Sequence, residues 1–531
     1  MSTTAPASAP TWENWSRNIV YTPPAADYYF MPTSLDELKQ VLAEAVEKGL
    51  TVRVSGQRHS QPPLVTEDNR TGGGPVTEYL IDMSCYADLG DSGTETMVVN
   101  PDGKSVTVNT GVREDDVDAF LTANDLMFDT VTAGGFFSLG GMTAVDVHGA
   151  TIQAPIFAGT VSAFTILGAD GNVSTINAQS EKFEGWSPLQ FARVSLGGLG
   201  IVTSITIDVL PRPYADTLQG SIQKLAIGSK QKFVERYQTL LQNHTRVESF
   251  FNPYAKNILS KSTMALIWDV VEDPKDKEKN NADDPATACQ LAGEGEFGAP
   301  FLTPQIVEEG AEAAARLAQS IDSPFIASAI VVAAFSEIES QVETANDSYS
   351  DLWLTKAARV MFMSYFIELP NLDAEGLGKV WDGLDVVSQI VTQDGNFHIA
   401  APLEFRFVKG GDTAMSGTYT QNPDSHFINL DLIGFVEATT SAEYPPELLQ
   451  FFADVERQWV AMGGFPHNGK MYGFYDPQAG PGTYTPAFNP NFLAELRQRR
   501  GERLQVFNAY RESRDPNGVF YNAYLQQLLE G

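Results

Sequence analysis

The sequence has little cysteine and little positive charge, and each shortage excludes a class of protein. Two cysteines, Cys85 and Cys289, occur in 531 residues, and they lie far apart without metal-ligand spacing. We therefore expect neither a disulfide framework nor a zinc site. Lys and Arg number 35 against 67 Asp and Glu, which gives a formal net charge of -32. Nucleic acids and anionic membrane surfaces bind clustered basic residues, so neither is an expected partner.

Long apolar runs are also scarce. The longest, from Pro324 to Phe335, has about twelve residues, whereas a membrane-spanning helix needs roughly 20. We expect a buried core helix there and no integral membrane segment. Residues 1–10 are small and polar and lack the basic and apolar regions of a secretory signal. The localisation stays open (secreted or periplasmic if a leader was removed, otherwise cytoplasmic), as does the choice between a monomer and a small homo-oligomer.

The sequence does contain two glycine-punctuated loops, about eighty residues apart. The first spans residues 54–60 and carries Gly56 and His59, and the second spans residues 134–149 and ends at His148-Gly149. Glycines let the backbone turn sharply and bring its N–H groups against a bound anion, so two such loops can hold a pyrophosphate without a lysine. The histidine in each loop favours a redox cofactor over a simple nucleotide.

The order of the predicted elements indicates two domains. The chain exceeds the roughly 250 to 300 residues at which one hydrophobic core stops growing. A capping box at Ser34 to Glu37 begins a helix that ends near Lys48, and a strand at 51–55 delivers the first loop. Alternation from Ile201 to Leu210 predicts a half-buried strand, and Pro211-Arg212-Pro213 marks a boundary. Other patterns predict strands at 106–110, 161–167, 247–251 and 264–271, helices at 114–124 and 229–242, and a charged surface loop at 272–281.

A third glycine segment, Leu196-Gly197-Gly198-Leu199-Gly200-Ile201-Val202-Thr203, follows the two loops. In this order the segments resemble the FAD-linked oxidases of the vanillyl-alcohol oxidase type (VAO/PCMH fold), which have a second loop ending in His-Gly and a Leu-Gly-x-x-Gly-Val-Val-Thr segment. The resemblance covers residues 20–212. It implies an FAD held by loop N–H groups and bonded covalently to the first-loop histidine, His59; a histidine that only forms hydrogen bonds is the alternative.

The C-terminal segment Arg514 to Asn522 resembles the family's Asp-Pro-x-x-x-Phe-x-Asn segment, which returns the chain to the FAD domain. The resemblance therefore implies an α+β flavoprotein. Its FAD-binding domain comprises residues 1–212 completed by about 470–531, and a substrate domain, residues 213–469, has an antiparallel sheet flanked by helices. The first loop departs from the family at Arg58, where a glycine is usual. The residues placed at the FAD are Ser55, Gly56, Gln57, Arg58, His59, Ser60, Gly134, Ser138, Leu139, Gly140, Gly141, Thr143, Val147, His148, Gly149, Gly197, Gly200, Ile201, Val202 and Asn522.

Glu404-Phe405-Arg406 is the first candidate for catalysis. In a strand, residues two apart project from the same face about 7 Å apart, so the carboxylate and the guanidinium would enter one site together. A guanidinium can stabilise an alkoxide and an anionic reduced flavin, and the carboxylate can orient it or accept a proton. Alone, this pattern is typical of a surface ion pair. It is also the substrate-domain pattern of covalent-flavin cholesterol oxidases and of alditol and aldonolactone oxidases.

Pro466-His467-Asn468-Gly469-Lys470 resembles the Pro-His-Trp-Gly-Lys segment of sugar and lactone oxidases, with Asn468 in place of tryptophan. The resemblance brings Lys470 to the substrate hydroxyl or to the flavin, where a cation lowers the pKa of the alcohol; a solvated lysine is the alternative. Three further residues are candidates for the same pocket, with ordinary structural roles as the alternative: His426 and Asn429 near the strand 427–435, and Glu248, which matches a pocket glutamate of the cholesterol oxidases.

Together these features predict an FAD-dependent oxidase that transfers a hydride from an alcohol carbon to flavin N5 and passes the electrons to dioxygen, giving hydrogen peroxide. A carboxylate or His426 would take the hydroxyl proton. The resemblance to the cholesterol oxidases favours a sterol or another bulky hydrophobic alcohol. The alternatives are an alditol or aldonolactone oxidase, a dehydrogenase with another electron acceptor, and a non-catalytic flavoprotein.

Overall fold

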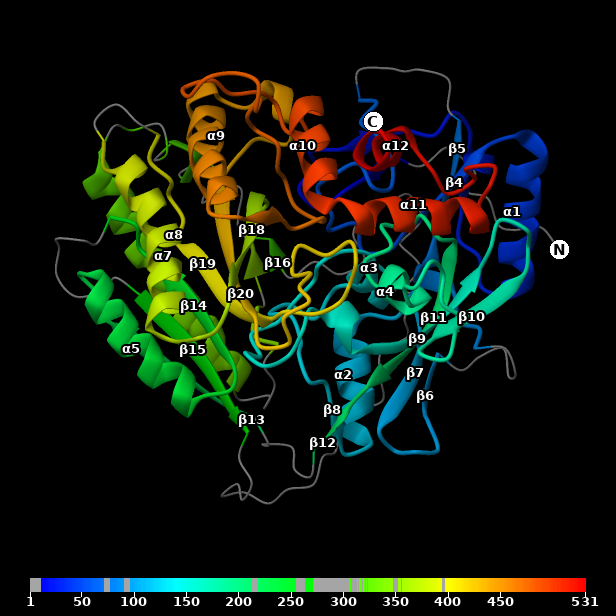
Figure 1. The fold of residues 1–531 in the computed structure, drawn as a ribbon, viewed down its shortest axis with the longest axis horizontal. Coiled ribbons are helices and arrows are strands. Elements are labelled where there is room, and N and C mark those ends of the chain that lie inside the picture. Colours follow the sequence, from blue (N-terminus) through cyan, green and yellow to red (C-terminus); the bar gives the residue numbers. More distant parts are fainter. Residues whose placement is uncertain are drawn as a thin grey trace.

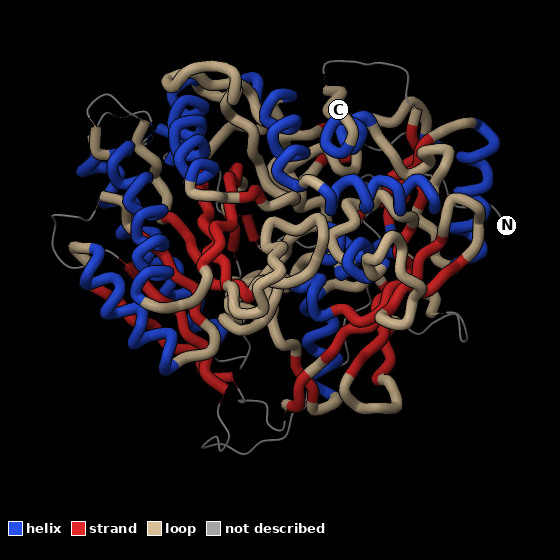
Figure 2. The backbone as a smooth tube through the Cα atoms, viewed as in Figure 1, coloured by secondary structure: helices blue, strands red, loops and turns tan. Residues whose placement is uncertain are grey.

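The computed structural model describes residues 11–531 except 71–76, 90–95, 213–217, 255–262, 271–304, 307–312, 347–351 and 394–396 and the single positions 314, 318, 320, 322 and 355. The charged run at 272–281 and Cys289 lie outside the described residues. Two sheet-containing halves lie side by side in Figure 1, with the loops of the chain's middle and C-terminal parts between them. Helices and strands are both abundant in each half (Figure 2), which confirms the α+β class.

The N-terminal half contains two main sheets and two small ones, β1 (Trp12–Glu13) with β2 (Val20–Tyr21) and β8 (Leu126–Met127) with β12 (Leu210–Pro211). A parallel sheet has the order β3 (Tyr29–Phe30), β5 (Glu78–Asp82), β4 (Thr51–Ser55), and helix α1 (Leu35–Lys48) leads into β4. The Ser34 side chain accepts a hydrogen bond from the Glu37 N–H, which confirms the predicted helix start. An antiparallel sheet has the order β10 (Val173–Asn177), β9 (Val161–Leu167), β11 (Ile201–Asp208), β7 (Ser105–Asn109), β6 (Met97–Val99). Helices α2 (Glu114–Ala123), α3 (Leu139–Ala144) and α4 (Pro188–Ala192) complete this half.

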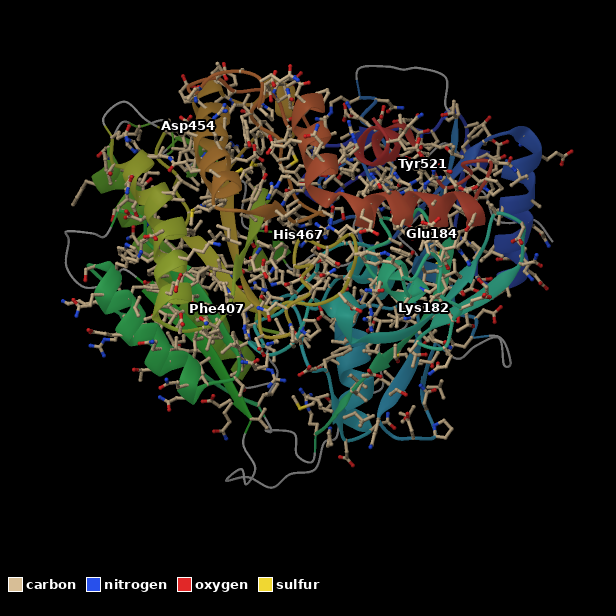
Figure 3. The ribbon with its side chains drawn as sticks, viewed as in Figure 1. Lys182, Glu184, Phe407, Asp454, His467 and Tyr521 are labelled. Carbon is tan, nitrogen blue, oxygen red and sulfur yellow. The ribbon has the colours of Figure 1, made fainter. Side chains whose placement is uncertain are left out.

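The second half has a seven-stranded antiparallel sheet, as expected. Its order is β13 (Leu218–Leu225), β15 (Thr263–Val270), β14 (Val247–Phe251), β19 (Leu403–Lys409), β20 (His426–Gly434), β18 (Met361–Leu369), β21 (Phe465–Pro466). Helices α5 (Lys230–Asn243), α8 (Ala374–Val391) and α9 (Pro446–Ala461) cover one face (Figure 1). Phe407, labelled in Figure 3, lies on this helical face, and its ring centroid is 6.2 Å from that of Tyr237 on α5. Because strand residues alternate, Glu404 and Arg406 project from the opposite face, toward the N-terminal half.

The C-terminal helices α10 (Pro490–Arg500), α11 (Glu502–Arg514) and α12 (Ala523–Leu529) lie beside the N-terminal half (Figure 1). The Val52 N–H donates to the Val519 carbonyl at 2.6 Å, and the buried Arg53 guanidinium donates to the Phe520 carbonyl at 2.5 Å. These contacts favour a discontinuous FAD domain, and we propose the division of the chain into 1–212 with 470–531, and 213–469.

Two sequence predictions are wrong. The first is that the apolar run at 324–335 is a buried core helix. The run belongs to a longer helix, α7 (Pro324–Asn346), in which Val331 and Phe335 are buried but Phe325 is 72% exposed. Within the described part of the chain, one helical stretch, Pro324–Glu343, is long and apolar enough to cross a membrane by length and composition alone, and 28% of its most apolar 18-residue window is buried. Cys85 is disulfide-bonded, contrary to the expectation from cysteine spacing, because pairing depends on contacts between segments distant in sequence.

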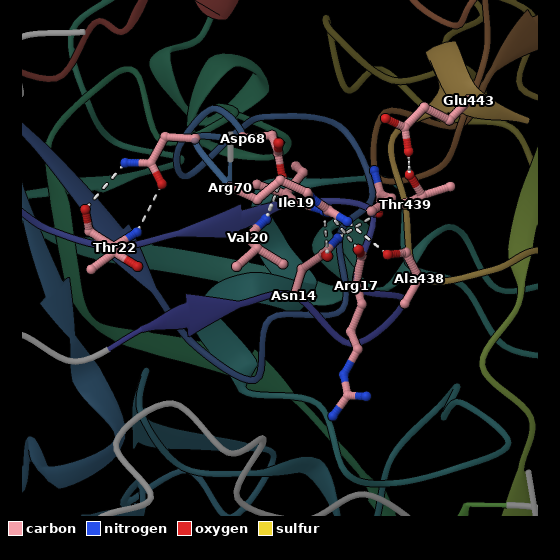
Figure 4. A network of polar contacts seen from close by, with 12 residues as sticks. Asn14, Arg17, Ile19, Val20, Thr22, Asp68, Arg70, Ala438, Thr439 and Glu443 are labelled. Atoms are coloured by element: carbon pink, nitrogen blue, oxygen red, sulfur yellow. Dashed lines mark hydrogen bonds and ion pairs between the residues drawn. The ribbon is translucent and has the colours of Figure 1, made fainter. Parts of the chain in front are cut away.

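A polar network joins the first described residues to the second half of the chain (Figure 4). Arg70 donates to the carbonyls of Arg17 and Ala438, each at 2.7 Å, and Asp68 accepts the Val20 N–H at 2.7 Å. This network fixes the segment that carries Trp12 and Trp15, both of which line the cavity described next.

Candidate active site

A cavity of about 420 Å³ lies between the two halves. The first loop, the second loop and the open face of the seven-stranded sheet all line it. His467, which is labelled in Figure 3, is one of the residues that line this cavity. Of the predicted residues, those that line the cavity are Gly56, Gln57, Arg58, His59, Ser60, Gly134, Ser138, Gly141, Val147, His148, Gly197, Glu248, Glu404, Arg406 and Lys470.

The two glycine loops touch each other. A Cβ atom on Gly56 would lie 1.9 Å from Ser138 Oγ, so the approach requires glycine, and the Gln57 N–H donates to the same oxygen at 3.4 Å. Arg58 has a φ of 59°, in the left-handed region that glycine usually occupies. Its buried guanidinium pairs with Asp82 at 2.8 Å and donates to the Tyr29 hydroxyl at 2.6 Å. The departure from the family is thus accommodated by a buried ion pair behind the loop.

His59 is enclosed by aromatic rings. Its ring centroid lies 4.6 Å from Trp15, 4.7 Å from Phe137 and 5.7 Å from Phe136. Burial lowers the pKa of His59 well below its usual value, and the positive charge of Lys470 lowers it further. The ring is therefore neutral, and its buried Nδ1 has no hydrogen-bond partner among the described residues. A neutral imidazole with an unengaged nitrogen fits a bond to a flavin, so the residues present suit FAD.

The remaining predicted cofactor residues do not line the cavity, and some of them hold the backbone of the second loop in place. The Leu139 and Gly140 N–H groups donate to the carbonyls of Val112 and Thr110, both at 2.9 Å. A Cβ on Gly149 would lie 2.2 Å from the Val131 carbonyl, so this glycine allows close packing. Outside the cavity lining are Ser55, Leu139, Gly140, Thr143, Gly149, Gly200, Ile201, Val202 and Asn522.

Arg406 is fixed between two carboxylates on the cavity face of the sheet. It lies on β19 opposite Glu248 of β14 and pairs with Glu248 Oε1 at 2.9 Å and with Glu404. Burial raises the pKa of Glu248 to about 8, with Arg406 opposing the shift and Glu404 adding to it. The Trp353 indole N–H donates to the second Glu248 oxygen at 3.1 Å. Burial alone would lower the pKa of Arg406, but the two carboxylates outweigh it and raise the pKa, so the guanidinium stays charged.

Lys470 enters the same cavity from the loop after β21. Its Nζ lies 3.9 Å from the ring centroid of Phe362, and burial lowers its pKa while Asp431 and Glu404 oppose that shift. Asn468, which replaces the family's tryptophan, is 1% exposed and donates through its backbone and side-chain amides to Asp146 at 2.8 and 2.6 Å. The small amide therefore ties this loop to Asp146 of the second glycine loop.

Two predicted residues lie elsewhere. His426, at the far end of β20, contacts Gln153 through Nε2 at 3.1 Å, and burial lowers its pKa to about 4. Asn429 is buried and donates to Ser364 Oγ at 2.9 Å. Neither residue is among the described residues that line the cavity. The site instead contains Asp431, which sequence reasoning missed; the signal was its position two residues beyond Asn429, on the same face of the strand.

Comparisons with known proteins agree with this arrangement. Residues 26–177, which contain both glycine loops, match a family described as FAD binding domain, and the fold is that of the FAD-linked oxidases of the vanillyl-alcohol oxidase type. A solvent-stable cholesterol oxidase superposes with a TM-score of 0.72 over 99% of both chains at 18% identity, which shows the shared fold.

Residues 221–528 match D-arabinono-1,4-lactone oxidase, and the chain belongs to that family. It is 23% identical to an L-gulonolactone oxidase of Scyliorhinus torazame over 98% of both chains. It is 25% identical to an L-gulono-1,4-lactone dehydrogenase of Mycobacterium tuberculosis over 98% of this chain and 99% of that protein.

Proposed function

We propose that this protein is an FAD-dependent enzyme that oxidises a hydroxyl-bearing carbon of a sugar-derived 1,4-lactone. The observation that carries the proposal is Arg406, held in the cavity by Glu248 and Glu404 and facing the glycine loops. A fixed, permanently charged guanidinium suits a group on which negative charge develops, here the substrate oxygen.

The lactone is favoured over the sterol that the sequence resemblance suggested. The named relatives act on aldonolactones, and the family is that of D-arabinono-1,4-lactone oxidase. The cavity also contains the charged side chains of Glu404, Arg406, Asp431 and Lys470. Covering them with a hydrocarbon ring system would desolvate them without new partners, whereas the hydroxyls of a sugar lactone can bond to them.

FAD, when bound, supplies the acceptor for the hydride that leaves the substrate carbon. The two glycine loops would hold its pyrophosphate, and we propose that His59 bonds covalently to the flavin. Arg406 stabilises the developing alkoxide, and Lys470 adds a second positive charge at the same place. Dioxygen is the proposed final acceptor, with release of hydrogen peroxide; a different acceptor is the second candidate, because one relative is named a dehydrogenase.

The test is anaerobic mixing of the purified protein with L-gulono-1,4-lactone, D-arabinono-1,4-lactone, xylitol or cholesterol while the flavin absorbance is recorded. Bleaching by a lactone is expected, and Arg406→Ala should slow it about 10²–10³-fold, in line with the loss of one group that stabilises an oxyanion. Arg236→Ala, at an exposed position of α5, is the control. A colourless protein, or bleaching by cholesterol alone, would refute the proposal; peroxide yield in air then separates oxidase from dehydrogenase.

A further inference from the structure

Asp431 occupies a defined place in the cavity face of the seven-stranded sheet. The strand register puts Phe250, Glu404, Asp431 and Ser364 in one row across four adjacent strands. Directly opposed residues of antiparallel strands have Cβ atoms about 4.5–5.5 Å apart, so the Asp431 and Glu404 carboxylates are close neighbours. Asp431 is 7% exposed and lines the cavity, and its Oδ1 has no hydrogen-bond partner among the described residues.

The other side of this carboxylate is anchored. Ser364 lies directly opposite Asp431 in the β18–β20 pair, and its hydroxyl lowers the pKa of Asp431 through a hydrogen bond and accepts the side-chain N–H of Asn429 at 2.9 Å. This chain of bonds orients the carboxylate while leaving Oδ1 unengaged. Asn429, which the sequence placed in the substrate pocket, is thus a positioning residue that acts through Ser364.

The other basic groups of the cavity are less suited to accept a proton. Glu248 and Glu404 are both paired with Arg406. Burial lowers the pKa of His148 and of His467, and the nearby cations lower it further, so protonation of either ring is unfavourable. Asp431 is the remaining carboxylate among the described residues that line the cavity. Burial raises its pKa, and the positive charge of Lys470 opposes that rise.

We propose that Asp431 is a catalytic residue, the carboxylate that accepts the hydroxyl proton during substrate oxidation. The inference rests on the proposed function. The substrate loses two hydrogens: its C–H bond breaks with the electron pair, which leaves as a hydride to FAD, and its O–H bond breaks with the proton passing to Asp431 Oδ1. The oxygen's electron pair then forms the C=O bond, and Arg406 stabilises that oxygen as its charge develops.

The electrostatic surroundings suit this task. Burial raises the pKa of Asp431 to about 6, the negative charge of Glu404 raises it as well, and Lys470 and Arg406 oppose the rise. A base is most effective when its pKa lies near the working pH. Because several groups titrate together, the measured value belongs to the cluster. The charges that act on Asp431 are those of Glu404, Lys470 and Arg406. The other charged and titratable groups that line the cavity with it are Glu248 on β14, Arg53, Arg58, Lys356, and His59, His148 and His467 on the loops.

Asp431→Asn tests the inference in the flavin-containing enzyme. In the wild type, the second-order rate constant for anaerobic flavin reduction by the lactone should decrease as the pH is lowered past an apparent pKa near 6. This decrease is the acidic limb of the pH profile. The variant should retain FAD but lose about 10²–10⁴ in rate, together with this acidic limb. Asp431→Glu should restore the limb in part. Asp424→Asn, which removes an exposed charge just before β20, is the matched control and should match the wild type.

A second experiment decides the matter if Asp431→Asn does not fold. Since the Glu404 charge raises the pKa of Asp431, Glu404→Gln should move the acidic limb to lower pH, whereas it should abolish the limb if Glu404 were the base. Difference infrared spectra without substrate should also show a protonated carboxyl that titrates near pH 6 in the wild type and whose band changes in Asp431→Glu. The comparison with the variant is needed because burial also raises the pKa of Asp115 to about 6.

The inference is overturned if Asp431→Asn reduces its flavin at the wild-type rate with the limb intact, if Glu404→Gln either abolishes the limb or leaves it at the same pH, or if the infrared band is missing. A wild-type protein that no lactone reduces would instead refute the proposed function, and the infrared titration would still report on Asp431.

Discussion

Gly56 and Ser138, 82 positions apart in the chain, lie so close that a Cβ atom on residue 56 would be 1.9 Å from Ser138 Oγ and 3.0 Å from its Cβ. The contact joins the end of β4 to the start of α3, and these two segments carry the predicted FAD loops. The spacing between the loops therefore depends on this contact. Both residues line the cavity, so a change at either residue alters it.

Gly56→Ala should destabilise the protein by about 1–3 kcal/mol, the usual cost of overpacking, and weaken FAD retention. The loss of stability caused by Gly56→Ala should be smaller in a Ser138→Ala background, because that change removes Oγ, the nearer of the two Ser138 atoms. Urea unfolding of the two single variants and the double variant measures this coupling. Gly411→Ala, where an added Cβ meets nothing within 4 Å, is the control. Equal costs for Gly56→Ala in both backgrounds would contradict the assigned contact.

Asn468→Ala should raise KM more than it lowers kcat, because Asn468 positions the loop that carries Lys470. The change removes the side-chain bonds to Asp146 at 2.6 Å and from Arg500 at 2.7 Å. Hydrogen bonds to charged groups contribute about 1.5–3 kcal/mol each, so a lower Tm should accompany the kinetic change. Steady-state kinetics with the lactone and thermal unfolding check both parts. Unchanged KM with a lower Tm would assign Asn468 a structural role alone.

Local signals explain what could be predicted from the sequence. The start of α1, the strand β4 and the glycine loops depend on residues within a few positions of one another, such as Ser34 and Glu37. The site depends on strand register: Arg406 meets Glu248 from 158 positions away. The pattern of Glu-x-Arg indicates a shared face but not its neighbours. For the same reason the sequence favoured His426, at the wrong end of β20, and missed Asp431, which only the pairing with Glu404 brings into the site.

The stability of the protein should fall as the pH rises from about 4.5 to about 8, in part because of Glu248. Its pKa is raised from 4.5 in the unfolded chain to about 8, so the folded state binds a proton that the unfolded state has released across this range. The stabilisation is complete below the lower value and is lost as the pH passes the higher one. Glu248→Gln should flatten this dependence, whereas the exposed Glu181→Gln should not. Thermal unfolding at several pH values is the measurement, and identical slopes for wild type and Glu248→Gln would count against the assignment.

His59→Ala should leave the fold intact, but no flavin should remain with the polypeptide after acid precipitation. The wild-type ring is half-buried, its lowered pKa keeps it neutral, and its Nδ1 is unengaged among the described residues, which is the state required for a bond to the flavin. His244→Ala, at a partly buried position paired with Asp269 outside the cavity, is the control. The variant should bind FAD reversibly through the two loops, so added FAD should restore yellow colour to native protein but not to the precipitate. Because His59 also packs against Trp15, His59→Gln provides a polar replacement that fills more of the space. Yellow precipitate from either His59 variant would place the covalent bond elsewhere, and colourless wild-type precipitate would show that the flavin is held by the loops alone.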